Sequence, residues 1–258
     1  MRKIKYSFLI CLIIFAFTSC KKTSNNTSTV NNTGSSNSTI SASNATSYYG
    51  IFYTGKNQAI VGGVLQAPNY NLSGAYFSSS PVFFPDGSKV VTVDTVKANG
   101  RTLIYQSFDN MYEDTSGYST GGNHLPFTFP ITWHVVGKNG IPSFTYLDNT
   151  PFASYTGYNA IPDTLNRAGF TFSLSGVSNV DGISALMDDG SFGHYSTSVI
   201  LGSNATSVTF TASDMTQLSA TNAGNISITF NKKNIENVYG KAMSFQSTYI
   251  FSKKISIK

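Results

Sequence analysis

Runs of alternating apolar and polar residues, separated by turn residues, constrain this chain more than any other feature of its sequence. From residue 170 to 175, Phe, Phe and Leu alternate with Thr, Ser and Ser, and a similar alternation recurs at 195–201 and 226–230. Successive side chains of a β-strand point to opposite faces of a sheet, so a period of two predicts half-buried strands. A chain dense in such strands folds as a sandwich or a barrel, and we therefore predict an all-β fold.

Two Asn-Gly pairs, at 99–100 and 139–140, mark tight turns between apolar runs. Tight hairpin turns need positive φ angles at both central residues, and Asn followed by Gly supplies them. We therefore predict two β-hairpins. The alternating run 91–94 and the run 103–105 flank the first turn, and 131–136 and 141–147 flank the second.

The region from Tyr48 to Lys258 is long enough for one large β domain or two smaller sandwiches. Its composition suits exported β proteins, since the chain has 19 Phe and 15 Tyr but few charged residues. Turn-forming residues interrupt the strand pattern in the middle of this region, at Gly157, Pro162 and Asp163. We predict two tandem β-sandwich domains, 48–160 and 161–258, the second of them immunoglobulin-like.

The leader, from Met1 to Cys20, has the anatomy of a secretory signal peptide. Three basic residues precede an unbroken apolar run, Phe8 to Phe17, and small polar residues then lead to Cys20. As a helix this run spans about 15 Å, half the thickness of a bilayer core, which disfavours a permanent transmembrane helix. From Lys21 to Ser47, most residues are Ser, Thr or Asn, and such a segment predicts a disordered tether.

The stretch from Phe17 to Cys20 resembles the lipobox of bacterial lipoproteins, although Phe17 stands where a leucine is usual. The resemblance implies that Cys20 is acylated and anchors the chain to a membrane. The Ser-Cys-Lys-Lys run is similar to leaders of Bacteroidetes lipoproteins, and residues 210–218 resemble a segment found in such lipoproteins of unassigned function. Surface-exported members of that group carry acidic residues after the cysteine, whereas this chain has two lysines, which favours the periplasmic face of the cell envelope.

Charge and cysteine content exclude several function classes. From Tyr48 onward, the basic and acidic residues balance, and a nucleic-acid binder needs a concentrated basic face. Both cysteines, Cys11 and Cys20, lie in the leader. The predicted folded region therefore has no disulfide, no thiolate metal site and no cysteine nucleophile.

The remaining chemistry-bearing residues predict neither an enzyme nor a metal or cofactor site. His124, His134 and His194 have no spacing typical of metal ligands, and none of them stands in the sequence context of a catalytic triad. The densest acidic group, Asp188-Asp189, is followed by glycine and indicates a hairpin turn, with a calcium loop as the less favoured alternative.

Two pairs of residues are candidate sites. Tyr155 and Tyr158 lie in an aromatic-rich stretch and are candidates for stacking against a sugar, although tyrosine is also common on half-buried strands. Thr95 and Thr164 each follow an aspartate in a triplet that resembles the O-glycosylation signal of exported Bacteroidetes proteins.

Together these features predict a lipid-anchored envelope protein with a non-enzymatic binding or structural role. Its expected partners are a membrane, through the N-terminal lipid, and another envelope protein or a glycan. A carbohydrate-binding lipoprotein of a glycan-uptake system and a fimbrial subunit that polymerises by strand exchange are the alternatives.

Overall fold

A computed structural model describes residues 40–42, 47–82, 87–114, 130–191 and 196–258. The described residues form strands joined by loops, with two short 3₁₀ turns, η1 (Gly87–Lys89) and η3 (Gly157–Ala160). The all-β prediction is confirmed. No helix among these residues is long and apolar enough to cross a membrane.

The strands are β1 (Ile40–Ala42), β2 (Tyr48–Val61), β3 (Val64–Leu65), β4 (Asn69–Val82), β5 (Thr95–Ala98), β6 (Arg101–Gln106), β7 (Met111–Glu113), β8 (Ile131–Val136), β9 (Phe144–Asp148), β10 (Thr164–Leu165), β11 (Gly169–Ser173), β12 (Gly182–Asp188), β13 (Ser196–Gly202), β14 (Ser207–Thr211), β15 (Thr221–Val238) and β16 (Lys241–Ile257).

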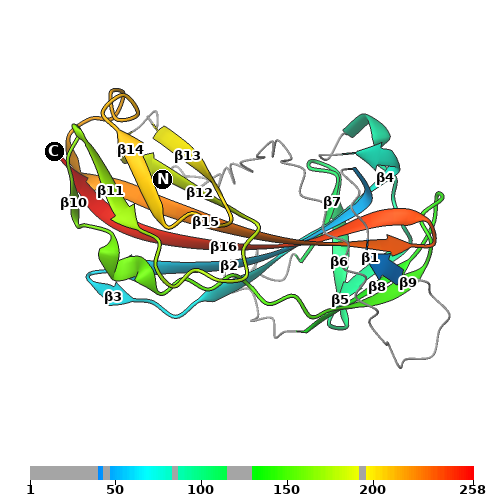
Figure 1. Ribbon diagram of the computed structural model, residues 1–258. Helices are drawn as coiled ribbons and strands as arrows, with labels where there is room; N and C mark the ends of the chain where they lie inside the picture. Colours follow the sequence, from blue (N-terminus) through cyan, green and yellow to red (C-terminus); the bar gives the residue numbers. More distant parts are fainter. Residues whose placement is uncertain (1–39, 43–46, 83–86, 115–129, 192–195) are drawn as a thin grey trace, which may run out of the picture. The chain divides into compact units, whose positions relative to one another are not determined.

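One large sheet contains most of the strands, in the order β13-β12-β15-β16-β2-β4-β7-β6-β5-β8-β9. Three short strands extend it: β1 pairs with β15, β10 with β16 and β3 with β2. A second sheet consists of β11 and β14 alone. Figure 1 shows the long hairpin β15–β16 running beside β2, to which β16 is parallel.

The first of two hydrophobic clusters, here called the Phe230 cluster, lies between two layers of strands. Phe172 and Phe210 come from the small β11–β14 sheet. Ile183 of β12, Phe230 of β15 and Phe251 of β16 come from the large sheet. Apolar side chains from two facing sheets interdigitate, which is the packing of a β-sandwich.

The second cluster, here called the Phe52 cluster, is enclosed by the large sheet alone. Most of its residues come from strands that follow one another across that sheet, from Val238 of β15 to Tyr146 of β9, and Val93 and Ile141 come from loops. The rings of Tyr146 and Phe245 stack with centroids 4.0 Å apart, although their strands are far apart in the strand order. The sheet therefore folds over on itself around this cluster.

Three long strands, β2, β15 and β16, contribute to both clusters. Strand β2 supplies Phe52 to one and Ile60 to the other, and β16 supplies Phe245 and Phe251 in the same way. Residues 48–160 and 161–258 therefore share both clusters, because each cluster takes side chains from both segments. The boundary expected after residue 160 does not separate two independent cores.

Both predicted hairpins are present in the structure. Strands β5 and β6 meet at 99–100, and β8 and β9 meet at 137–143, with positive φ at Asn99 and Asn139 as the Asn-Gly pairs predict. The first hairpin begins at Thr95, later than the expected start at residue 91.

Candidate functional site

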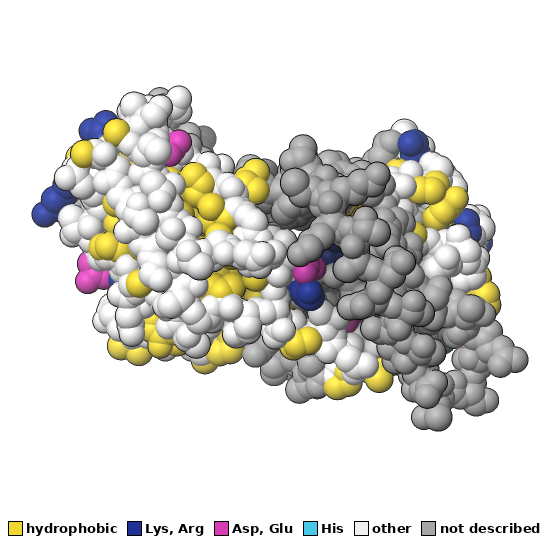
Figure 2. All heavy atoms as spheres, viewed as in Figure 1, with side chains coloured by type: hydrophobic (Ala, Val, Ile, Leu, Met, Phe, Trp, Pro, Cys, Tyr) yellow, Lys and Arg dark blue, Asp and Glu magenta, His cyan; other side chains and the backbone are white. Residues whose placement is uncertain are grey.

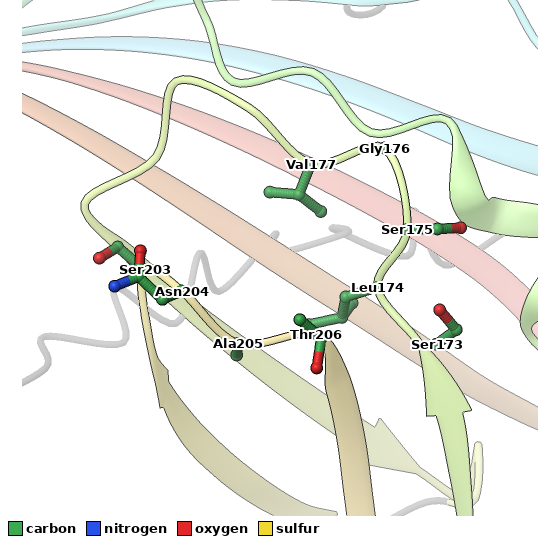
Figure 3. Close-up of a pocket in the computed structure, with 9 residues that line it drawn as sticks. All are labelled: Ser173, Leu174, Ser175, Gly176, Val177, Ser203, Asn204, Ala205 and Thr206. Atoms are coloured by element: carbon green, nitrogen blue, oxygen red, sulfur yellow. The ribbon is translucent and has the colours of Figure 1, made fainter.

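A shallow pocket with a volume of about 520 Å³ opens between two loops at the end of the β11–β14 sheet where β11 ends and β14 begins (Figure 3). One loop follows β11 and the other joins β13 to β14. The pocket is lined by Ser173, Leu174, Ser175, Gly176, Val177, Ser203, Asn204, Ala205 and Thr206. None of these side chains is charged, and more than half of them bear a hydroxyl or amide group.

Apolar side chains form part of the pocket wall. Leu174 is buried, and Val177 and Ala205 are half-buried against the Phe230 cluster. The hydroxyl-bearing Ser203 and Thr206 are exposed, as is Asn204. A neutral ligand with many hydroxyl groups fits this surface, because it exchanges hydrogen bonds with such side chains and presents small apolar faces. Figure 2 shows few charged side chains on the face of the molecule that it displays.

Backbone hydrogen bonds hold the two loops together. The N–H of Leu174 donates to the carbonyl of Thr206 at 2.8 Å. On the far side of the first loop, Ser154 and Ser178 exchange two backbone hydrogen bonds, and their hydroxyl oxygens lie 2.8 Å apart. The pocket wall is therefore tied to the segment that carries the candidate tyrosines.

Of those tyrosines, Tyr155 is a core residue. Its side chain is 5% exposed, and its ring packs on Phe230 and Phe251 at centroid distances of 5.2 and 5.4 Å. Burial raises the pKa of its hydroxyl. Sugar stacking needs an exposed ring face, which Tyr155 does not offer, so the structure gives it a packing role instead.

Tyr158 lies in η3 and is only half-buried, with its ring stacked on Phe251 at 5.9 Å. Its segment touches the pocket loop directly. Gly176 has a φ of +70°, and a Cβ atom there would collide with the Thr156 hydroxyl. A Cβ at Gly157 would likewise meet the Ser175 carbonyl. These two glycines let the two segments approach closely.

The two candidate glycosylation sites differ in accessibility. Thr164 is exposed in β10, which is hydrogen-bonded along β16. The neighbouring Asp163 forms an ion pair with Lys253 at 2.8 Å, and this contact lowers the pKa of the Asp163 carboxyl. Thr95 is half-buried in β5, between β6 and β8. A glycosyltransferase would reach Thr164 more easily.

Neighbouring serines hydrogen-bond to the acidic group for which a calcium loop is the less favoured alternative. Asp189 is buried and accepts hydrogen bonds from the N–H groups of Ser191 at 2.9 Å and Ser219 at 3.0 Å. Hydrogen bonding by Ser191, and then by Ser219, lowers the pKa of Asp189 to about 2. Gly190 has a φ of +68°, as a turn requires. Within the described ranges no three His, Cys, Asp or Glu side chains gather in a way that could hold a metal ion.

Of the three histidines and the anchor cysteine, only His134 lies among the residues that the structure describes. His134 is exposed on β8 beside Thr145, whereas the adjacent Trp133 is fully buried, as strand alternation predicts. His124, His194 and the anchor residue Cys20 lie outside the described residues.

A polar group that the sequence did not reveal lies between β9 and β15. Asn234 donates to the hydroxyl of Tyr146 at 2.7 Å and to the carboxyl of Glu236 at 3.0 Å. Burial, and then the charge of the nearby Asp148, raises the pKa of Glu236. Burial also raises the pKa of Asp148, which is 3% exposed. Because the two acids lie on strands that are distant in the chain, only the folding of the sheet brings them together.

Tyr146 and Asp148 are buried, whereas Asn234 and Glu236 are half-buried, and the hydrogen bonds of this group join β9 to the hairpin. Comparison with known proteins adds no relative: no protein-family model, no curated protein and no solved structure matches this chain.

Proposed function

We propose that this chain is a lipid-anchored protein of a bacterial cell envelope, held by an acyl group on Cys20, with a non-enzymatic binding or structural role. The order of segments supports this proposal. An apolar run ends just before a cysteine, and a polar segment follows it from Lys21 to Ser47. Within that segment Ile40–Ala42 form β1, so the tether that we propose ends before Ile40. Each acyl methylene buried in a bilayer contributes about 0.8 kcal/mol, so several chains hold a protein there stably.

The single observation that carries the proposal is the position of Cys20. It follows Ser19 at the end of the leader, and the rest of the chain after it contains no other cysteine. A cysteine retained for packing or for a disulfide would be expected within the β body instead. The two lysines after Cys20 favour the periplasmic face.

Replacing the cysteine tests the anchor. Cys20→Ala should move the protein from the membrane fraction to the soluble fraction when the producing cells are fractionated. The matched control is Cys11→Ala, which removes the other leader cysteine and should leave the protein in the membrane fraction. Membrane retention of Cys20→Ala would refute the proposal.

Glycan binding is the second candidate, and the uncharged, hydroxyl-bearing pocket favours it. Asn204 is exposed at the rim and offers both a donor and an acceptor, as a sugar hydroxyl requires. Binding of the protein to a glycan array should weaken in Asn204→Leu. Asn149→Leu, an exposed control in a loop after β9, should bind as the unmodified protein does. If the unmodified protein binds no glycan on the array, glycan binding is rejected.

For the fold, we propose that residues 161–258 form an immunoglobulin-like sandwich. The two layers around the Phe230 cluster support this assignment, since β11–β14 faces β12, β15 and β16. Ile60 of β2 completes that cluster from outside the segment.

A further inference from the structure

Besides the Gly62-Gly63 turn, three turns among the described residues have positive φ at two consecutive residues, and these three do not share one sequence. Both residues have positive φ at 99–100 (48° and 79°), at 139–140 (53° and 84°) and at 239–240 (50° and 80°). The first two turns are Asn-Gly, the sequence that this geometry favours. The third is Tyr239-Gly240, and a bulky side chain is strained at positive φ. Asparagine at position 239 would relieve this strain. A strained residue in place of a relaxed one points to a role for its own side chain, here the tyrosine ring.

The Tyr239 side chain projects from the end of the β15–β16 hairpin. It is 51% exposed, which makes it one of the few large aromatic residues on the described surface. A lysine and a second tyrosine lie at the same end: the ammonium of Lys241 is 3.7 Å from the centre of the Tyr49 ring. Phenol rings and lysine side chains are the groups that proteins place at the level of lipid headgroups.

The chain enters the β body at this same end. Ile40 of β1 pairs with Val238, the residue before Tyr239. Gly50, near the start of β2, pairs with Met243, three residues after the turn. Figure 1 shows β1 beside this end of the hairpin. The two strands that follow the tether therefore both begin next to the Tyr239 turn.

The length of the tether limits how far this end can be from the membrane. A polar coil as long as the segment between Cys20 and Ile40 has a root-mean-square span of about 25 Å. The far end of β2 leads into the Gly62-Gly63 turn. A strand as long as β2 covers about 45 Å, so that turn lies well beyond the Tyr239 end. The described chain therefore begins at the Tyr239 end of β2 and not at the Gly62-Gly63 end.

We propose that the turn from Tyr239 to Lys241 contacts the headgroup region of the bilayer in which Cys20 is anchored. The phenol ring of Tyr239 lies among the headgroups, and the ammonium of Lys241 pairs with lipid phosphate. This contact rests on the proposed lipid anchor, and it fixes which end of the β body faces the membrane.

Fluorescence in vesicles tests the contact in the full, acylated chain. Tyr239→Trp and Val64→Trp place a reporter at the two ends of β2, since Val64 is 63% exposed beside the Gly62-Gly63 turn. The native Trp133 is fully buried, and its signal is subtracted using the unmodified protein. The vesicles contain brominated phosphatidylcholine and phosphatidylglycerol, since bromine quenches only nearby indoles.

We expect roughly threefold stronger quenching of Trp at 239 than at 64, as an interfacial aromatic requires. Equal quenching at the two positions, or none at 239, overturns the contact. The matched variant Tyr239→Asn tests the ring itself. It should keep the fold and the acyl group, but it should make Tyr49 and the turn more accessible to protease at the vesicle surface.

The failure of the anchor can be told apart from the failure of the contact. Flotation of the same samples, with the mass of the N-terminal peptide, reports acylation independently. A chain that neither floats nor carries an acyl group refutes both proposals. An acylated, floating chain whose Trp at 239 stays unquenched refutes the contact alone.

Discussion

The two hydrophobic clusters are built in different ways on the same three strands. The Phe230 cluster lies between a small sheet and the large one, so its two walls are separate pieces of structure. The Phe52 cluster lies inside a single folded sheet, where the Phe52 ring contacts Phe77, Trp133, Phe144 and Phe245. The comparison shows that long strands, rather than a domain boundary, organise this molecule. The clusters should therefore unfold together.

Cutting the chain between the segments gives the largest expected effect. Residues 161–258 expressed alone lose β2, which pairs with β16 continuously from Gly50 to Ile60. The fragment also leaves Met243 and Phe245 without the rest of their cluster. We expect it to lack the dispersed amide spectrum of a folded β protein in NMR. A well-dispersed spectrum would show that the Phe230 cluster is an independent domain.

Removing one central ring should destabilise both clusters. Phe52→Ala should lower the free energy of unfolding by about 3–5 kcal/mol, since a large buried side chain leaves a cavity. Urea unfolding monitored by Trp133 and by circular dichroism should still give a single transition. The control Phe108→Ala removes a ring that is 76% exposed and should change stability little. Two separate transitions in Phe52→Ala would contradict the coupling of the clusters.

The buried acid beside the Phe52 cluster should give that region a pH dependence. Burial raises the pKa of Asp148 above its ordinary 3.8, so above pH 3.8 the folded chain binds more protons there than the unfolded chain. Stability from this group is therefore lost as the pH rises through the raised pKa. In urea titrations, the free energy of unfolding of Asp148→Asn should therefore decline less between pH 3.8 and neutrality than that of the unmodified protein.

The control for that experiment has the opposite sign. The pKa of Asp163 is lowered by Lys253, so its contribution is present above pH 3.8 and is lost as the pH falls through the lowered value. Asp163→Asn should thus weaken the protein most at neutral pH. If the free energy of unfolding changed with pH in the same direction in both variants, the raised pKa of Asp148 would be contradicted.

The smallest expected change in stability concerns the turn of the β15–β16 hairpin, next to the Phe52 cluster. Tyr239→Asn replaces a strained residue with one that suits positive φ, and it should raise stability by up to about 1 kcal/mol. Thermal unfolding measures the gain. The control Asn139→Tyr makes the reverse change in the same kind of turn. It also removes the 2.9 Å hydrogen bond from the Asn139 amide to the Thr92 carbonyl, so it should lower stability by more than Tyr239→Asn raises it. A loss of stability in Tyr239→Asn would mean that the ring packs in the fold.

Local signals predicted much of the fold, whereas long-range pairing could not be predicted. The Asn-Gly pairs identified two hairpins because turn geometry depends on two adjacent residues. The β15–β16 hairpin was not predicted as a hairpin because residues 231–237 are mostly polar and its turn is Tyr-Gly. Those polar residues find partners far along the chain, as when Lys232 pairs with Asp181 at 2.6 Å.

The candidate site was less predictable than the fold. Tyr155 and Tyr158 look alike in sequence, and only the packing of Phe230 and Phe251 makes one of them a core residue. The pocket joins the loop after β11 to the loop before β14, and Ser, Gly and Asn in such loops look like any turn. The sequence carries no signal for which loops will meet.

The mass of the N-terminal peptide of the mature protein, purified from membranes, tests the central claim most directly. We predict that this peptide begins at Cys20 and carries fatty acyl groups. An unmodified Cys20, or a mature chain that begins at another residue, would contradict the account.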